Sequence, residues 1–548
     1  MPKRAQISPE HEPSEGSPQQ RSGKTSGHDS SAAAHEYDVL ILGGTVVDGT
    51  GADPRVADVG VRGEHIVFIG AVPQDAHAQT TIDATRLIVA PGFVDVHTHA
   101  DFTVESVPAA HACVRQGVTT VVTGNCGTSA FPAPALGVDF ESYAARVEAT
   151  EPAVNLAALV GHGALRTAVV GADRRAATVE ETGRMADLLD VAARQGAFGL
   201  STGLIYAPGS FAGTDEVAAL AEVAHAHDLL YATHLRDEGG GLLEALDEAL
   251  DVAQRTGVRL QVSHLKAMGP PNHGKVHDAL LRIDAARASG LDVACDVYPY
   301  TASSTLLTSR LPDWAMDGGN TRLLGRLQDA DTSERIAAEL EGNSDWAFLP
   351  DAVVLAGLPE GRYSEFVGCN LREVAKRTDS TPAQTMLDVL RQHEAQVWII
   401  NHALAEDDVR TVLRHPAAAV GSDGWELTTE CAGSPHPRHF GTFARILKKY
   451  CHDEGSQEAA LSLPEAIRKM TALPAQRLGL RDRGVLAPGL IADVAVFDPE
   501  EVADTATFLA PKSYALGTRA VLVNGVPVLV EGEQTSARPG RVLRKPRH

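Results

Sequence analysis

Several features that define other protein classes are missing from this sequence of 548 residues. Its six cysteines are too few and too scattered for a disulfide framework, so a reducing compartment, the cytoplasm, is the expected location. No apolar stretch approaches the length of a membrane span, and no hydrophobic signal segment follows Lys3 and Arg4. The chain also lacks a glycine-rich phosphate loop and internal repeats. These absences favour a soluble globular protein outside the P-loop and solenoid classes.

Positive charge is scarce as well. The chain has 48 lysines and arginines against 71 aspartates and glutamates, which gives a net charge of -23. Such an excess of negative charge argues against a nucleic acid or an anionic membrane as partner. It does not restrict the charge of a small substrate, because the local charge of a site can oppose that of the whole chain.

The two ends of the chain have a different pattern from its middle. Residues 1–35 are rich in Ser, Pro, Gln, Gly and charge, which is typical of a disordered extension. Short strand-like runs separated by turns follow between Tyr37 and Leu87, and similar runs return between Ala492 and Val528. Neither set is long enough to bury a core alone. We therefore expect one small β domain of antiparallel strands, built from residues 36–90 and 480–540.

Residues 91–479 alternate apolar strand-like runs with alanine-rich helical segments, which predicts parallel βα units and a (β/α)8 TIM-like barrel. The pattern contains nine candidate strands, so at least one of them is wrong or lies outside an eight-stranded barrel. Residues of about 311–375 fit the repeat poorly and indicate an insertion. The candidate strands end at or include His97, Thr123, Gly161, Ser201, His234, Ser263, Asp296, residues 397–400 and residues 418–421.

Metal-ligating side chains recur where these strands end. His97 and His99 are spaced i, i+2, which places both imidazoles on the same face of a strand. Active sites of (β/α)8 barrels lie at the C-terminal ends of the strands. Histidine, cysteine and aspartate at several such ends predict a metal site, and zinc suits this set of donors. The candidate ligands are His97, His99, Cys126, His234, His264 and Asp423.

This layout resembles the amidohydrolase superfamily, with His-x-His after the first strand, single histidines after the fifth and sixth, and aspartate after the last. Most binuclear members bridge their metals with a carbamylated lysine. This chain has no lysine between Lys24 and Lys266, so that bridge is absent from the first five strands. Cys126 is the natural substitute, because a thiolate is a good zinc ligand and can bridge two ions.

A cysteine in the run Gly124-Asn125-Cys126-Gly127 is similar to the D-aminoacylase (N-acyl-D-amino-acid deacylase) family. The resemblance covers most of residues 37–530. It implies zinc-dependent hydrolysis of the linear amide of an N-acyl-D-amino acid, which yields a carboxylate and a free D-amino acid. The D-configuration comes from the resemblance alone. Other segments that carry it are Phe93–Asp101, Gly199–Gly209, Asp296–Thr305, His436–Phe443, Lys469–Ala475 and Gly484–Asp493.

The resemblance also implies roles for the ligands. Cys126, His234 and His264 would form the tight zinc site. His97, His99 and Asp423 would form a second site that is weakly or variably occupied. Asp423 would take a proton from the attacking water and pass it to the leaving nitrogen. Cobalt or nickel could occupy the same ligands if the protein were supplied with those metals instead of zinc.

The free carboxylate of such a substrate needs cations that are not metal ligands. Lys266 and Arg438 meet that need, and an arginine can bind a carboxylate with two hydrogen bonds. The resemblance adds Tyr206, Tyr298 and Ser304 as substrate-binding residues. His162 is expected to lie behind the metal ligands. The expected partner is a small N-acyl amino acid, and the sequence does not indicate an oligomeric state.

Members of the family differ in the side chain that they accept, which is neutral or hydrophobic, D-glutamate or D-aspartate. An acidic side chain would need a further cation, for which Arg236 and Arg310 are the candidates. The sequence places neither of them in the pocket, and a hydrophobic side chain is slightly favoured.

Three other functions remain open at this stage. A cyclic-amide hydrolase of the hydantoinase or dihydroorotase kind is disfavoured by the missing lysine and by Asn125-Cys126. A deaminase would usually hold one metal without a bridging thiolate. A non-catalytic metal-binding scaffold would be expected to have lost Asp423 or a ligand, and none is missing.

Overall fold

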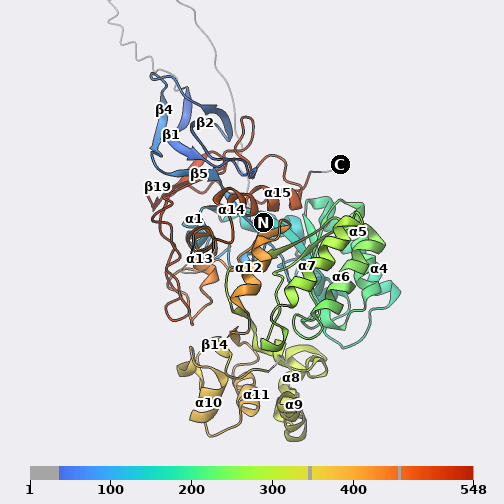
Figure 1. Ribbon diagram of the computed structural model, residues 1–548. Helices are drawn as coiled ribbons and strands as arrows, with labels where there is room; N and C mark the ends of the chain where they lie inside the picture. The colour runs from blue at the N-terminus through green and yellow to red at the C-terminus, as the bar shows by residue number, and fades with distance from the viewer. Residues whose placement is uncertain (1–35, 343–347, 454–457, 547–548) are drawn as a thin grey trace, which may run out of the picture. The chain divides into compact units, whose positions relative to one another are not determined.

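The computed structural model describes residues 36–342, 348–453 and 458–546 of the chain (Figure 1). The predicted disordered extension, residues 1–35, lies outside this part. The described residues form an eight-stranded parallel sheet, a nine-stranded sheet and a three-stranded sheet, with helices between them. None of the described helices has the length and apolar character that crossing a membrane requires.

The eight-stranded sheet is a parallel barrel, which confirms the predicted fold class. Its first and last strands meet through a bridge between Thr98 and Gly424. The N–H of Asp423 donates to the carbonyl of His97, and the N–H of His99 donates to that of Gly424, each at 2.7 Å. In order the strands are β6 (Phe93–Asp95), β7 (Val118–Thr123), β8 (Asn155–Gly161), β9 (Gly199–Gly203), β10 (Leu230–His234), β11 (Arg259–Val262), β12 (Val293–Val297) and β16 (Ala418–Val420).

The barrel strands are buried almost throughout, as expected for parallel strands with a packed interior and helices outside. Figure 1 shows α4 to α7 side by side around them. The helices of the barrel region are α1 (His111–Val114), α2 (Phe140–Ala149), α3 (His162–Val169), α4 (Val179–Gln195), α5 (Thr214–Ala226), α6 (Leu242–Thr256), α7 (Lys275–Ala288), α12 (Glu406–Arg414), α13 (Arg438–Arg445), α14 (Leu463–Met470) and α15 (Ala472–Leu478).

Helix α4 shows how the sequence sets these elements. Thr178 and Glu181 form a capping box that satisfies the first free N–H groups of the helix. Gly196 ends it in the left-handed conformation, at φ 113°, which glycine adopts without a steric penalty. Between these caps, Met185 and Leu189 are fully buried and lie one turn apart on the face that packs on the barrel.

The nine-stranded sheet combines both ends of the described chain, as the predicted small β domain requires. Strand β5 pairs with β17 in antiparallel register, Pro91 opposite Val494. The expectation of antiparallel strands throughout was wrong, because β1 pairs in parallel with β4 and β5. The hairpin β2–β3 supplies the long crossover that a parallel pair needs. The strands are β1 (Tyr37–Val46), β2 (Arg55–Arg62), β3 (His65–Gly70), β4 (Ala78–Asp83), β5 (Ile88–Pro91), β17 (Val494–Phe497), β18 (Thr518–Val523), β19 (Val526–Val530) and β20 (Glu533–Gln534).

A third, antiparallel sheet lies in the chain between β12 and β16. Its order is β13 (Ser303–Leu306), β15 (Trp398–Asn401) and β14 (Val353–Gly357). With α8 (Gly319–Gln328), α9 (Ala330–Gly342), α10 (Leu371–Arg377) and α11 (Pro382–Gln392), it has its own hydrophobic core. The candidate strand at 397–400 is β15, so it is the one outside the barrel. The insertion predicted at about 311–375 falls within this segment.

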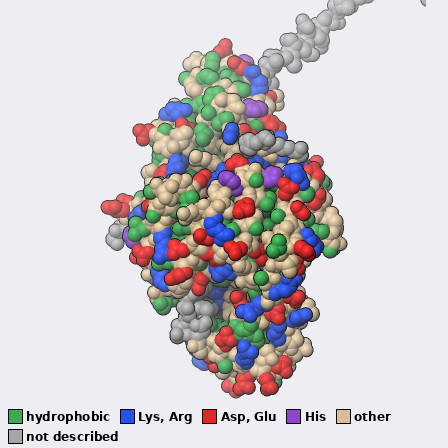
Figure 2. Space-filling view, turned by 90° about the vertical axis from the view of Figure 1, so that its right-hand side faces the viewer, with side chains coloured by type: hydrophobic (Ala, Val, Ile, Leu, Met, Phe, Trp, Pro, Cys, Tyr) green, Lys and Arg blue, Asp and Glu red, His purple; other side chains and the backbone are tan. Residues whose placement is uncertain are grey.

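Acidic and basic side chains are interspersed on the face shown in Figure 2. Inside, Phe93 of β6 stacks on Phe443 of α13, with ring centroids 5.6 Å apart and planes at 15°. Its ring also lies 6.4 Å from Phe497 of β17. One buried side chain therefore joins the first barrel strand, a barrel helix and the terminal sheet.

We predict that Phe93→Ala lowers the free energy of unfolding by about 3–5 kcal/mol, because it leaves a cavity where three elements meet. Urea unfolding of the purified protein measures this. The matched control is Phe102→Ala, whose side chain is 44% exposed and whose loss is expected to cost less than about 1 kcal/mol. Equal effects of the two changes would contradict the prediction.

Candidate metal centre

All six predicted ligands meet at the C-terminal end of the barrel. His97 and His99 follow β6, Cys126 follows β7, His234 ends β10, His264 follows β11 and Asp423 follows β16. Their ligand atoms form two groups, and within each group the atoms lie within 4.8 Å of one another. Cys126 belongs to both groups. The groups are His97, His99, Cys126 and Asp423, and Cys126, His234 and His264.

The sulfur of Cys126 lies at the middle of this arrangement. It is 3.2 Å from Nε2 of His97 and 3.4 Å from Nε2 of His264. On the far side, Oδ1 of Asp423 is 3.1 Å from Nε2 of His99 and 3.7 Å from Nε2 of His97. These distances allow the thiolate and the carboxylate to contribute ligand atoms at the same end of the barrel.

Neighbouring charges favour the ionised forms of the Cys126 thiol and the Asp423 carboxyl. Burial alone would raise the pKa of the Cys126 thiol, but His97 and His264 outweigh it and hold that pKa well below its ordinary value. Burial also opposes ionisation of Asp423, whereas Arg438 and His99 hold the pKa of its carboxyl well below the usual range. Both side chains are therefore available as anionic ligands at neutral pH.

Three ligands have a left-handed backbone. The φ angles are 52° at Cys126, 35° at His264 and 53° at Asp423. Non-glycine residues in this region cost on the order of 1–3 kcal/mol each, and such residues cluster at functional sites. The turn at Cys126 also needs Gly203, because a Cβ there would lie 2.1 Å from the carbonyl oxygen of Cys126. The surrounding structure thus imposes the direction of these side chains.

The donors fit a zinc ion. Nδ1 of His234 is buried and has no hydrogen-bond partner among the described residues, which leaves a nitrogen for a metal. Imidazole, thiolate and carboxylate are the ligands that zinc prefers. The side chains present therefore match the cofactor that the sequence analysis expects.

Asp296 supports two of the ligands, a role that the sequence analysis missed. Its Oδ1 lies 3.1 Å from Nδ1 of His97 and accepts the backbone N–H of His264 at 2.8 Å, while Oδ2 accepts from Gln261. A carboxylate on the far nitrogen fixes the tautomer and orientation of a ligating histidine. The available signal was an aspartate at the buried end of β12.

Glu238 was also missed, and it changes the interpretation of Lys266. Its two oxygens lie 3.4 Å from Nε2 of His234 and 3.2 Å from Nδ1 of His264. The ammonium of Lys266 donates to the same carboxylate and lies 2.7 Å from Nδ1 of His264. Burial opposes ionisation of Glu238, yet His234 and Lys266 hold its pKa well below the usual range. Lys266 is thus held beside the ligands by a buried ion pair.

The other predicted substrate-binding residues are linked to Asp423, to one another or to neighbouring residues of the site, and their roles stay predictions. NH1 of Arg438 donates to Oδ2 of Asp423 at 2.8 Å, and NH2 donates to the backbone carbonyl of Ser304 at 3.1 Å. The ring of Tyr298 lies 5.2 Å from Cζ of Arg438 and 5.7 Å from Nζ of Lys266. The hydroxyl of Tyr206 accepts from Thr305 at 3.0 Å.

Three remaining candidates have other contacts. Arg236 is held by Glu248 and by two backbone carbonyls, so it supports the fold. The imidazole of His162 is hydrogen-bonded to Glu216 rather than to a ligand. Arg310 is buried, and its guanidinium interacts electrostatically with Tyr206 and Glu238 of the site. The two arginines nominated for an acidic side chain line one cavity of about 190 Å³, together with Ile205 and Asp237.

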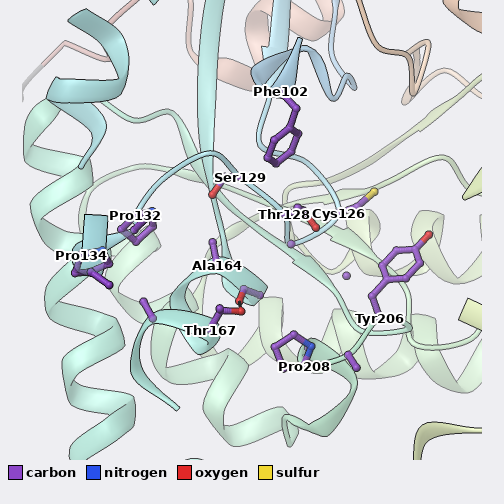
Figure 3. A pocket seen from close by; sticks show the side chains of 18 of the residues that line it. Phe102, Cys126, Thr128, Ser129, Pro132, Pro134, Ala164, Thr167, Tyr206 and Pro208 are labelled. Atoms are coloured by element: carbon purple, nitrogen blue, oxygen red, sulfur yellow. Dashed lines mark hydrogen bonds between the residues drawn. The ribbon is translucent and has the colours of Figure 1, made fainter. Parts of the chain in front are cut away.

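One cavity is lined by the predicted ligand Cys126, and another by the predicted substrate-binding residues Ser304 and Arg438. The larger, of about 540 Å³, is shown in Figure 3, with Cys126 and Tyr206 at one end and Pro132 and Pro134 at the other. The smaller, of about 150 Å³, is lined by Ser304, Arg438, His436, His439, Trp398 and Trp425 among others.

Comparisons with known proteins agree with this geometry. Residues 80–529 match the model of the amidohydrolase family. The chain is 38% identical over 525 residues to the N-acyl-D-glutamate deacylase of Alcaligenes xylosoxydans xylosoxydans, covering 93% of this chain and 97% of that protein. The D-aminoacylase of the same organism is 37% identical over 530 residues, covering 94% and 99%.

A comparison with solved structures also finds an N-acyl-D-amino-acid deacylase. One match is the crystal structure of the N-acyl-D-glutamate deacylase of Bordetella bronchiseptica, complexed with zinc and with a phosphonate inhibitor that mimics the tetrahedral intermediate. It is 36% identical to this chain and superposes with a TM-score of 0.80, covering 93% of this chain and 99% of that one. The chain therefore belongs to the N-acyl-D-amino-acid deacylase family of the amidohydrolases.

Proposed function

We propose that this protein is a zinc-dependent amidohydrolase that cleaves N-acyl-D-amino acids into a carboxylate and a free D-amino acid. The observation that carries the proposal is Cys126, which joins two groups of ligands at the mouth of the barrel. The relatives named N-acyl-D-glutamate deacylase and D-aminoacylase, 38% and 37% identical over nearly the whole chain, support this reaction and the D-configuration.

Asp423 is the proton carrier that we propose. When bound, zinc polarises the scissile carbonyl and lowers the pKa of water. Arg438 holds Oδ2 of Asp423, which leaves Oδ1 facing the histidine side of the site. Asp423 takes one proton from the attacking water and gives it to the amide nitrogen as the C–N bond breaks. The second proton of the water stays on the new carboxyl group, so the amine leaves neutral; loss of that proton, which the amine can accept, then gives the carboxylate.

Two buried donors suit the free carboxylate of the substrate. Nε of Arg438 and the hydroxyl of Tyr298 have no hydrogen-bond partner among the described residues. Unpaired polar groups are costly in a protein interior, so they indicate a ligand with acceptor oxygens. The ammonium of Lys266, which is paired with Glu238, lies 5.7 Å from the centre of the same tyrosine ring. We infer that the amino-acid carboxylate binds here.

The proposed stoichiometry is one tight zinc and one weaker one. The tight site consists of Cys126, His234 and His264, in which nitrogen and sulfur donors predominate. The second consists of His97, His99 and Asp423, whose carboxylate is already shared with Arg438. A ligand that also neutralises a cation has less negative charge to offer a second ion.

Replacement of Cys126, the residue common to both ligand groups, tests the proposed zinc site. In Cys126→Ala we expect zinc to fall from about one ion per chain to nearly none, with loss of D-selective turnover, because the tight site keeps only two donors. Metal analysis and hydrolysis of N-acetyl-D- and N-acetyl-L-amino acids measure both. Cys451→Ala is the matched control, since this cysteine is not among the ligand groups. Zinc retained in Cys126→Ala would refute the assignment.

Removal of the proton carrier should separate binding from chemistry. Asp423→Asn keeps the shape of the side chain but cannot accept the proton, so we expect kcat to fall by about 10²–10⁴-fold. Zinc at the tight site should remain, as measured in the same samples. Turnover at the wild-type rate in Asp423→Asn would rule out this role.

We infer an acidic amino-acid side chain rather than the hydrophobic one expected from sequence, and the burial of Arg310 supports this. Arg236 is held by Glu248, whereas Arg310 is buried; burial lowers the pKa of its guanidinium, and the charges of Tyr206 and Glu238 oppose that shift. A buried guanidinium near the substrate is suited to a second carboxylate. We therefore propose D-glutamate or D-aspartate as the amino acid.

Arg310→Met tests this preference. We expect the ratio of kcat/KM for N-acetyl-D-glutamate to that for N-acetyl-D-leucine to fall by about 10- to 100-fold, the value of a charged hydrogen bond. Steady-state kinetics on both substrates give the ratio. A wild type that prefers D-leucine, or an unchanged ratio in the variant, would restore the hydrophobic alternative.

A further inference from the structure

The larger cavity lies across the barrel from the carboxylate-binding residues. Its walls come from the segments after β7, β8 and β9, which include Cys126, Ala164 of α3 and Tyr206. Lys266 follows β11 and Arg438 follows β16. In the strand order of the barrel, β8 is four strands from β12, which is halfway round. The cavity and the cations therefore occupy opposite arcs around the metal ligands.

This placement assigns the two halves of the substrate. An amide bond is planar and almost always trans, so its acyl and amino-acid parts leave the scissile carbonyl in opposite directions. When the carboxylate binds at Arg438, the acyl group points towards Cys126 and Tyr206, where the cavity opens. The acyl group is then the part of the substrate that this cavity receives.

Apart from the thiolate of Cys126 at its metal end, the lining is uncharged and largely apolar. Among the described residues, none that lines the cavity is Asp, Glu, Lys, Arg or His, and the polar side chains besides Cys126 are hydroxyls such as those of Thr128 and Ser129. Alanines, including Ala164, leave the space open. At the rim, Leu136 is 80% exposed and Phe102 is 44% exposed. An apolar chain lying against these side chains would remove them from water.

The volume of the larger cavity indicates how large an acyl group it can hold. Cavities of about 300–1,000 Å³ hold ligands of drug size, and this one measures about 540 Å³. An acetyl methyl group would leave most of it empty. We propose that the enzyme acts on N-acyl amino acids with a long or bulky apolar acyl group, such as a medium-chain fatty acyl or an arylacetyl group. This inference rests on the proposed deacylase function.

The test varies the acyl group and the amino acid independently. Wild-type kcat/KM is measured for N-acetyl, N-octanoyl and N-phenylacetyl derivatives of both D-glutamate and D-leucine. We expect the octanoyl or phenylacetyl derivative to exceed the acetyl derivative by at least about tenfold for either amino acid, since each buried methylene contributes to binding. Ala164→Phe, which fills the cavity, should reduce that ratio by about tenfold or more.

Ala176→Phe is the matched control, because Ala176 is exposed and does not line the cavity. It should keep the wild-type ratio. Thr167→Trp, at an exposed position of α3 that lines the cavity, provides a second variant if Ala164→Phe fails to fold.

Three results would overturn the inference. Acetyl substrates could be preferred by the wild type, Ala164→Phe could leave the acyl ratio unchanged, or it could alter the choice between glutamate and leucine instead. Each of these leaves the deacylase function standing. If no N-acyl-D-amino acid is hydrolysed at all, the proposed function itself fails.

Discussion

The site depends on how the barrel closes. Two backbone hydrogen bonds, from Asp423 to His97 and from His99 to Gly424, join the end of the first strand to the segment after the last. They bring a histidine pair near residue 100 into contact with an aspartate beyond residue 420. Without these hydrogen bonds the first and last strands of the barrel would separate, and the predicted ligands that follow β6 and β16 would lie too far apart to share a metal ion. The distances around Cys126 are therefore a consequence of strand pairing as much as of the side chains.

Charge in this site is balanced in pairs. Asp423 is matched by Arg438, and Glu238 by Lys266, while Asp296 contacts His97. Each carboxylate that burial would otherwise neutralise is kept ionised by a neighbour. The same pairs hold the side chains in place, which is what a reaction that depends on small distances needs. A lone cation in this region would carry a large desolvation cost.

The fold class and the ligand positions were predictable because both follow from local patterns. An apolar run followed by histidine or cysteine indicates a strand end, and parallel strands put such ends together. Contacts between distant elements were not predictable. Glu238 and Asp296 gain their roles only when β10, β11 and β12 lie side by side, and nothing near Arg236 in sequence shows that Glu248 neutralises it. Likewise β15 resembles a barrel strand in sequence, and only its pairing with β13 and β14 excludes it.

The terminal sheet has a consequence for the order in which the chain is made. Strand β5 leads directly into the first barrel strand, yet it lies between β1 and β17, and β17 begins only at Val494. A ribosome therefore releases almost the entire barrel before that sheet can be completed. During this time β5 has an open edge, and open edges invite pairing with other chains. Synthesis of β17, rather than of the catalytic region, therefore determines when β5 gains its second neighbour.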